Sequence, residues 1–158
     1  MVLHGEIVVL RTPQPREYDL LTSLRNKHRH WFFDDAEVSL EDGRRWLASR
    51  TEDNCLLAVE AHGAVVGTIG WSRDKGAAEL GRVILDYDLT RKADIAPAGL
   101  AQDAFDTALA HLLRTGPVWC GVKPGNHSSS RLMRRAGLRR VPGEPGVETW
   151  ASAENVAA

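Results

Sequence analysis

Three apolar segments in succession, joined by two tight turns, constrain the fold of this chain more than any other feature. Residues 55–61 and 64–71 are two such runs, separated by the turn dipeptide His62-Gly63. Asp74-Lys75-Gly76 then leads into a third run over residues 78–85. Because connections this short bring each run back beside the one before it, we expect an antiparallel meander of three strands.

The segments on either side of the meander mix helical and strand-like patterns. Before it, a strand is predicted over residues 6–10, and helices are predicted from Tyr18 and from the capping signal at Ser39. After it, the pattern predicts a helix over 101–112, a strand over 118–122, a helix from Asn126 to Gly137, and strands near 138–141 and 147–151. This order predicts a mixed α/β (α+β) fold, with helices on both faces of a central, mostly antiparallel sheet.

Length and composition fit a single soluble domain. The chain has 158 residues, of which 43% are hydrophobic and 26% are charged. A net charge of −1 provides no overall field to hold nucleic acid or an anionic membrane, so neither is an expected partner. The apolar runs are far shorter than the ~20 residues of a membrane span. We therefore expect a cytoplasmic protein, monomer or homodimer, with one domain over residues 1–151 and a flexible tail over 152–158.

Cysteine and histidine patterns give no indication of a metal centre. Cys55 and Cys120 stand far apart in apolar runs, which is typical of reduced core residues. His28 and His30 form an i, i+2 pair without a third ligand nearby. We expect no metal.

The segment from Asn126 to Leu138 is the most specific motif in the sequence. It resembles the Asn-x-x-Ser-x-x-Leu run, followed by Gly and an aliphatic residue, of the GNAT superfamily of acyl-CoA-dependent N-acyltransferases. Residues 78–85 are similar to a strand of the members that acetylate ribosomal-protein N-termini or nucleotide-linked amino sugars, and residues 24–47 resemble the amino-sugar group. The resemblance covers nearly the whole chain and implies a GNAT-like fold whose sheet splays between its fourth and fifth strands.

The same resemblance implies a site for acetyl-CoA as co-substrate. Splayed strands leave backbone groups free for the pantetheine amides, here on Val83, Ile84 and Leu85 and on the strand over 119–122. The family's phosphate loop reads Arg/Gln-x-x-Gly-x-Gly/Ala and precedes a helix N-terminus, where an anion is favoured. In this chain, Asp94 takes the place of the first glycine, and a solvated loop without a ligand is the alternative. The residues expected at the donor, besides the three strand positions, are Arg91, Lys92, Ala93, Asp94, Ile95, Ala96, Asn126 and Ser129.

Glu79 is the residue expected to remove the proton from the acceptor amine. It lies on the strand that leads to the acyl site and is predicted to share a face with Gly81, Val83 and Leu85. The alternative role is an ion pair with Arg82 or Arg73. In the family, a tyrosine often protonates the leaving thiolate, but here Met133 stands at that position. Ser129 is the nearest hydroxyl of the motif and is the second catalytic candidate, with a helix-start hydrogen bond as its alternative role.

The expected acceptor site combines an aromatic run with one cation. Its candidates are Arg25, Trp31, Phe32, Phe33 and Trp71, which would suit a sugar, a base or a phosphorylated acceptor. Arginines at 131, 134, 135, 139 and 140 form either a solvated helix face or a contact for a phosphate.

We therefore expect transfer of an acetyl-sized group to a primary amine of a small metabolite, with an amino sugar or nucleotide-linked amino sugar first among acceptors. Alternatives are a protein N-terminus as acceptor, a carrier-protein thioester as donor, and a binding module without turnover.

Overall fold

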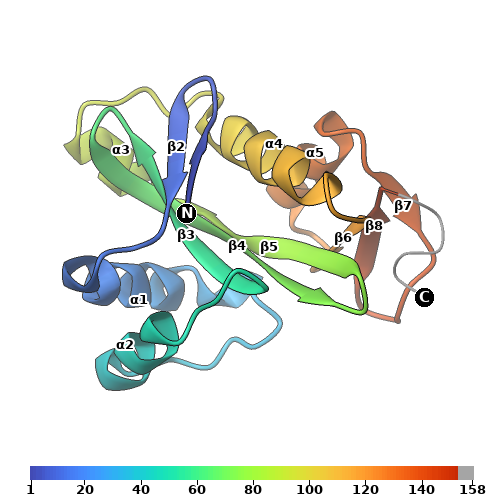
Figure 1. The fold of residues 1–158 in the computed structure, drawn as a ribbon, viewed down its shortest axis with the longest axis horizontal. Coiled ribbons are helices and arrows are strands. Elements are labelled where there is room, and N and C mark those ends of the chain that lie inside the picture. The colour runs from blue at the N-terminus through green and yellow to red at the C-terminus, as the bar shows by residue number, and fades with distance from the viewer. Residues whose placement is uncertain (153–158) are drawn as a thin grey trace.

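In the computed structural model, which describes residues 1–152, one eight-stranded sheet forms the centre of the molecule (Figure 1). Its strand order is β1-β2-β3-β4-β5-β6-β8-β7, and all neighbours are antiparallel except β5 and β6. This confirms the expected mixed fold, although β1 was not predicted. The strands are β1 (Val2–His4), β2 (Val8–Arg11), β3 (Asn54–Ala61), β4 (Ala64–Asp74), β5 (Ala77–Leu85), β6 (Val118–Val122), β7 (Arg139–Val141) and β8 (Glu148–Ala151).

Helices cover both faces of this sheet, as expected (Figure 1). The pair α1 (Tyr18–Lys27) and α2 (Leu40–Ala48) packs on one face, and α4 (Leu100–Leu113) packs on the other. A short helix, α3 (Tyr87–Lys92), follows β5 directly, and α5 (His127–Arg135) follows β6. Single 3-10 turns at Pro15–Glu17 and Arg29–Trp31 flank α1. Helix α3 was not predicted, because six residues are too few to show a helical period.

The two turns of the meander have the conformation that their residues favour. His62 and Gly63 have φ values of 49° and 83°, and Lys75 and Gly76 have 51° and 82°. Two successive positive φ angles are the mark of a type I′ turn, whose twist matches that of the strands it joins. The three strands pair in the expected antiparallel register.

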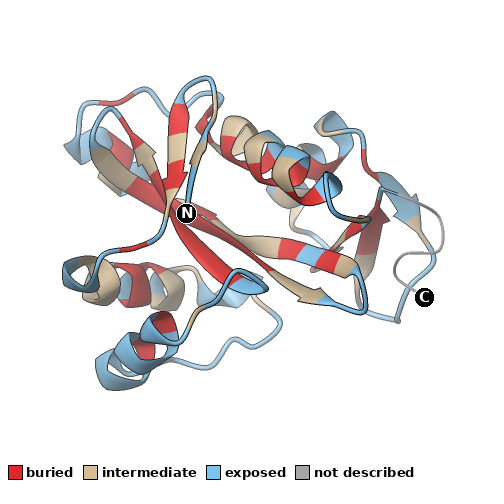
Figure 2. Ribbon diagram, viewed as in Figure 1, coloured by how far each residue is buried: buried red, intermediate tan, exposed pale blue. Residues whose placement is uncertain are grey.

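Two hydrophobic clusters hold the layers together (Figure 2). The larger lies between α4 and the sheet, where Phe105 is fully buried against residues such as Ile69 and Leu80. The smaller lies under α1 and α2 and contains Leu21, Leu24, Leu47, Leu56 and Ile84. Burying a side chain of this size stabilises the fold by about 1.5–3 kcal/mol.

Both cysteines are core residues, as predicted. Cys55 and Cys120 are buried and unoxidised. Burial raises the pKa of the Cys55 thiol to about 11 and that of Cys120 further still. Both thiols are therefore protonated at neutral pH and are poor nucleophiles.

A buried carboxylate connects α1 to α3. Asp86 is 1% exposed and its Oδ2 accepts hydrogen bonds from Lys27 Nζ at 2.7 Å and from His28 Nε2 at 2.8 Å. Its Oδ1 accepts from the backbone N–H of Leu89 at 2.9 Å, which caps α3. Burial alone would raise the pKa of Asp86, but these three hydrogen bonds lower it to about 2.

The end of the described chain is tied to the sheet. Ser152, the first residue of the expected tail, donates its backbone N–H to the Val118 carbonyl and accepts from the Val118 N–H, each at 2.9 Å. Residues 153–158 of that tail lie outside the described residues. Between residues 1 and 152, no helix has the length and apolar character needed to cross a bilayer.

Candidate active site

A gap opens between β5 and β6 shortly after the two strands meet. Their parallel pairing joins Ala78 to Val118 and Glu79 to Trp119, and it ends there. Beyond Glu79, the edge of β5 that faces β6 has no strand partner in the described part of the chain, so its backbone polar groups are available to a ligand. The predicted splay of the sheet is thus confirmed.

A β-bulge in β5 helps to produce this divergence. Gly81 pairs with Gly70 and Ile84 pairs with Thr68, so Arg82 and Val83 together stand opposite one residue of β4. Arg82 adopts a φ of 54°, which is rare for a residue other than glycine. A bulge bends its strand and changes where the following side chains point.

The bulge corrects one prediction about faces. Glu79 was expected to share a face with Val83 and Leu85, but both of these pack against the larger core. Ile84 instead lies on the side of α1 and α2, where it lines the same cavity as Glu79 and Arg82. An isolated glycine within a strand often marks a bulge, so Gly81 was the available signal.

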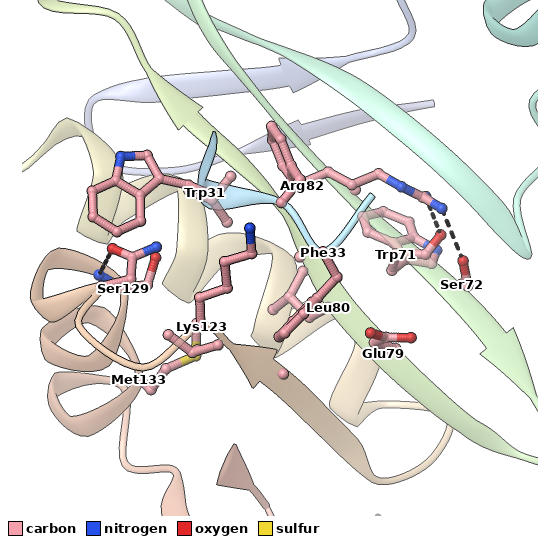
Figure 3. A pocket seen from close by; sticks show the side chains of 17 residues that line it. Trp31, Phe33, Trp71, Ser72, Glu79, Leu80, Arg82, Lys123, Ser129 and Met133 are labelled. Carbon is pink, nitrogen blue, oxygen red and sulfur yellow. Dashed lines mark hydrogen bonds between the residues drawn. The ribbon is translucent and has the colours of Figure 1, made fainter. Parts of the chain in front are cut away.

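Two hollows meet beside Glu79. A cleft of about 190 Å³ occupies the gap between β5 and β6, and its walls include Trp31, Leu80, Gly121 and Met133 (Figure 3). A larger cavity of about 680 Å³ lies between the α1/α2 pair and the sheet. Four residues line both hollows, namely Phe32, Phe33, Glu79 and Arg82.

The Glu79 carboxylate makes no ion pair within residues 1–152. The expected alternative partners are engaged elsewhere. Arg82 donates to the carbonyls of Cys55 and Trp71, each at 3.2 Å, and to Ser72 Oγ at 3.1 Å (Figure 3). Arg73 donates to Thr115 Oγ1 at 2.8 Å and lies 4.0 Å from Asp53.

This environment changes the proton affinity of Glu79. Partial burial raises the pKa of its carboxyl above the ordinary value, and the nearby charge of Arg82 opposes that rise. A carboxylate that keeps its lone pairs free, with a raised pKa, is suited to accept a proton.

Ser129 reaches the cleft from the first turn of α5. Asn126 caps this helix by accepting the Ser129 backbone N–H at 3.3 Å on its Oδ1, and Gly137 ends it at a φ of 90°. The Ser129 side chain lines the cleft, and its hydroxyl has no hydrogen-bond partner in the described residues. Met133, which stands at the family's tyrosine position, is 3% exposed and also borders the cleft.

Lys123 is a cleft residue that the sequence analysis missed. It follows β6 immediately, and its Nζ donates to the His30 carbonyl at 3.0 Å. In Figure 3 its side chain passes between Trp31 and Met133. Its position after a buried strand, at the start of a Pro-Gly turn, was the only signal available.

The aromatic run divides between core and cleft. Phe32 packs against the smaller core, whereas Trp31 and Phe33 are 44% and 52% exposed. All three border the cleft in the gap, and Phe32 and Phe33 also line the larger cavity. Trp71, also expected there, keeps its ring in the larger core against His111, with ring centroids 5.6 Å apart. Trp71 nevertheless lines the cleft, and its backbone carbonyl accepts a hydrogen bond from Arg82.

Arg25 anchors the loop that carries these aromatics. Its guanidinium donates to the carbonyls of Asp34 and Ala36 and lies 5.7 Å from the centre of the Phe32 ring. The next residue, Asn26, exchanges two hydrogen bonds with Val38, at 2.7 Å and 2.8 Å. Arg25 lines the larger cavity, but its hydrogen bonds position the loop over residues 32–38.

The segment predicted as a phosphate loop forms the C-terminal cap of α3. Asp94 has a φ of 58°, so it adopts the left-handed conformation for which the family uses glycine. The Asp94 N–H donates to the Arg91 carbonyl at 3.1 Å, and the Ile95 N–H donates to the Thr90 carbonyl at 2.9 Å. These two bonds form a Schellman motif. The Ala93 N–H donates to the Leu89 carbonyl, as in the rest of the helix.

The side chains of residues 91–96 are partly in the core and partly in solvent. Ile95 is 9% exposed and belongs to the larger core, whereas Lys92, Asp94 and Ala96 are exposed. Arg91 forms an ion pair with Asp88. The amides ready for an anion come a few residues later, at the start of α4: within residues 1–152, the N–H groups of Gly99 and Ala101 have no acceptor.

Comparison with known proteins identifies the family. A family model described as an acetyltransferase (GNAT) domain matches residues 8–139. The chain belongs to the GNAT acetyltransferase family. No curated protein sequence matches it significantly.

Solved structures of GNAT proteins share the fold over nearly the whole chain. A RimL ribosomal-protein alpha-N-acetyltransferase in complex with coenzyme A is 14% identical, with a TM-score of 0.77 over 99% of both chains. A GNAT-family acetyltransferase from Bacillus anthracis is 16% identical, with a TM-score of 0.73 over 96% of both chains. A third, described as a probable GNAT acetyltransferase from Chromobacterium violaceum, is 22% identical, with a TM-score of 0.69 over 95% of this chain and 83% of its own.

As a GNAT-type N-acetyltransferase, the chain has features that fit the acetyl-CoA used by its family. The free edge of β5 suits the pantetheine amides, and the unpaired amides of α4 suit a phosphate. Residues 123–140 carry six Lys and Arg and no acidic residue. The five arginines among them are all exposed, and Arg134 and Arg140 each lie 5.8 Å from the centre of the Trp150 ring. Among residues 1–152, no cluster of His, Cys, Asp and Glu could hold a metal ion.

Proposed function

We propose that this enzyme transfers an acetyl group from acetyl-CoA to a primary amine of a small metabolite. One observation carries the proposal: the unpaired Glu79 carboxylate stands where the gap between β5 and β6 meets the larger cavity. The gap suits the donor and the cavity suits the acceptor, so the carboxylate lies at the point where the two would react.

In this proposal, Glu79 removes a proton from the acceptor ammonium, directly or through one water. Bound acetyl-CoA supplies the thioester whose carbonyl carbon the free amine attacks. A C–N bond forms and the C–S bond breaks, so the thiolate that leaves needs a proton. Ser129 borders the cleft with a hydroxyl that has no hydrogen-bond partner among the described residues, so it can hydrogen-bond to that sulfur, while Met133 has no proton to give. Arg82 keeps its hydrogen bonds to the β3 and β4 backbone and holds the bulge in place.

The acceptor cavity supports a small molecule. Its walls combine apolar and aromatic side chains with several charged groups, which suits a small polar ligand. An amino sugar and a protein N-terminus were both expected acceptors, and both present a primary amine. Asp94 is the reason for considering a carrier-protein thioester as donor, and Asp94 and Met133 together are the reason for considering a binding module without turnover.

Calorimetry with acetyl-CoA and with free CoA tests the donor half of the proposal. We expect both to bind, and binding of neither would favour the carrier-protein donor or the binding module. Release of the CoA thiol in the presence of an amine panel tests the acceptor half. A matched pair of variants, Glu79→Gln and Glu41→Gln, then tests the base, since Glu41 is an exposed carboxylate on α2. Only Glu79→Gln should lower turnover while acetyl-CoA affinity is kept, and equal rates in both would remove Glu79 from the mechanism.

A further inference from the structure

The larger cavity carries an excess of negative charge. Its charged lining residues are four carboxylates and two guanidinium groups, namely Asp34, Glu37, Asp42, Glu79, Arg25 and Arg82. Two negative charges are therefore left over in a hollow of about 680 Å³. All four acidic residues are solvent-exposed, so their charge acts on a bound cation most strongly at short range.

The two guanidinium groups of the cavity make more hydrogen bonds with the protein than its carboxylates do. Arg25 and Arg82 both donate to backbone carbonyls of the surrounding fold. The Glu37 carboxylate makes no hydrogen bond or ion pair with any described residue, and the Asp34 carboxylate accepts one bond, from the Ala36 N–H at 3.3 Å. Asp42 lies 3.6 Å from Arg45. The oxygens of Glu37, Asp34 and Glu79 thus remain available to a ligand that brings its own donors.

The charge of the two halves of the site is opposite. Residues 34–42 contain five Asp and Glu and no Lys or Arg, and three of these acidic residues, Asp34, Glu37 and Asp42, line the larger cavity. Residues 123–140, on the side of the gap, contain six Lys and Arg and no Asp or Glu. A donor with several phosphates and an acceptor with several ammonium groups would each meet a surface of the opposite sign.

We propose that the acceptor is a small di- or polycationic amine, in which one nitrogen reacts beside Glu79 while a second, protonated nitrogen is bound by Glu37 and Asp34. This inference rests on the proposed function and names the substrate class of the same cavity. Between the two ends, a methylene chain would lie against Trp46, Leu56 and Ile84. An acceptor with phosphates, such as a nucleotide-linked amino sugar, would instead face the excess of carboxylates.

The chemistry of this step is balanced. The reacting ammonium gives one proton to Glu79 and forms a C–N bond to the acetyl carbon, while the C–S bond breaks and the thiolate is protonated. The acetylated end loses its positive charge, and the second ammonium keeps its own. The product therefore binds a negatively charged cavity less tightly than the substrate does, which favours its release.

A comparison of putrescine with n-butylamine, which has the same carbon chain but one nitrogen, tests the proposal. We expect kcat/KM for putrescine to be about tenfold higher, from one added charge interaction in a partly screened cavity. Glu37→Gln should reduce this preference several-fold. Asp35→Asn is the matched control, because Asp35 lies in the same loop and does not line the cavity.

Each outcome has a distinct meaning. Equal kcat/KM for the two amines, or equal loss of the preference in Glu37→Gln and Asp35→Asn, would overturn the dication site. A basic peptide or glucosamine preferred over putrescine and spermidine would also overturn it, while amine-dependent thiol release would still uphold the proposed function. Thiol release with no amine at all would overturn both proposals.

Discussion

Replacing Asp94 by glycine should stabilise the protein and tighten its binding of CoA. Asp94 occupies the position after the end of α3 with a φ of 58°, and glycine is the residue that takes this conformation most readily. An exposed carboxylate there also stands at the negative end of a helix dipole, which disfavours it. Its charge would in addition repel the phosphates of a donor at the start of α4.

The size of each effect follows from these observations. Relief of a left-handed conformation contributes about 1 kcal/mol to the free energy of unfolding, somewhat less for Asp than for other residues. Repulsion between an exposed carboxylate and a phosphate ~7 Å away is about 0.5–1 kcal/mol in a mostly aqueous medium, or a two- to fivefold change in Kd. At ~0.1 M salt the Debye length is about 10 Å, so this second effect weakens as salt is added.

Two variants separate the conformational effect from the charge effect. Asp94→Gly removes both the side chain and its charge, whereas Asp94→Asn removes the charge alone. We expect both to lower the calorimetric Kd for CoA at low salt, with the difference from the parent shrinking at moderate salt. Asp94→Gly should show the larger rise in the free energy of unfolding by urea. An unchanged or weaker affinity in both variants would refute this reasoning, because it would mean that the carboxylate points away from the donor or makes a contact that the donor site needs.

Three further predictions concern the remaining parts of the site. Because the pKa of Glu79 is raised, its charged form lowers the stability of the folded protein above that pKa, so Glu79→Gln should unfold at a higher urea concentration near neutral pH. The variant should also lose the decline of kcat/KM at low pH that protonation of a catalytic base produces. Because Phe33 lines both hollows, Phe33→Ala should raise the acceptor KM more than it weakens acetyl-CoA affinity, and a larger loss of donor affinity in calorimetry would assign Phe33 mainly to the donor side. Since the pKa of Asp86 is lowered to about 2, its charged form stabilises the fold above the ordinary aspartate pKa, and this stabilisation is lost as the pH falls toward 2. Asp86→Asn should therefore lower the free energy of unfolding in urea by about 2–3 kcal/mol near neutral pH, and a stability equal to that of the parent would contradict this.

The features that could be predicted from sequence are those decided locally. Turn dipeptides that accept positive φ, as at His62-Gly63, define the meander without reference to the rest of the fold. The Asn126 cap and the Gly137 stop are likewise properties of a few neighbouring residues, and both occur where expected. At these turns and helix ends, the conformation that the local residues favour is the one that the whole fold requires.

Features decided by tertiary packing could not be predicted. A strict period of two does not register the bulge at Arg82, so Val83 and Leu85 were assigned to the wrong face. The same period cannot tell which face of β4 is the core, so it does not show that the Trp71 ring is buried. Lys123 enters the cleft only because the loop that carries His30 lies against the end of β6, a contact between segments far apart in the sequence.

The most direct test of the account is the amount of N-acetylated amine formed per CoA thiol released. Purified protein, acetyl-CoA and a confirmed acceptor would be sampled over time, with the thiol measured by its reaction with a chromogenic disulfide and the product by mass spectrometry. We expect equal amounts of thiol and N-acetylated acceptor, both rising with acceptor concentration to saturation and both strongly reduced in Glu79→Gln. Thiol release without acetylated amine, or acetyl-CoA binding without release in the presence of any amine, would contradict it.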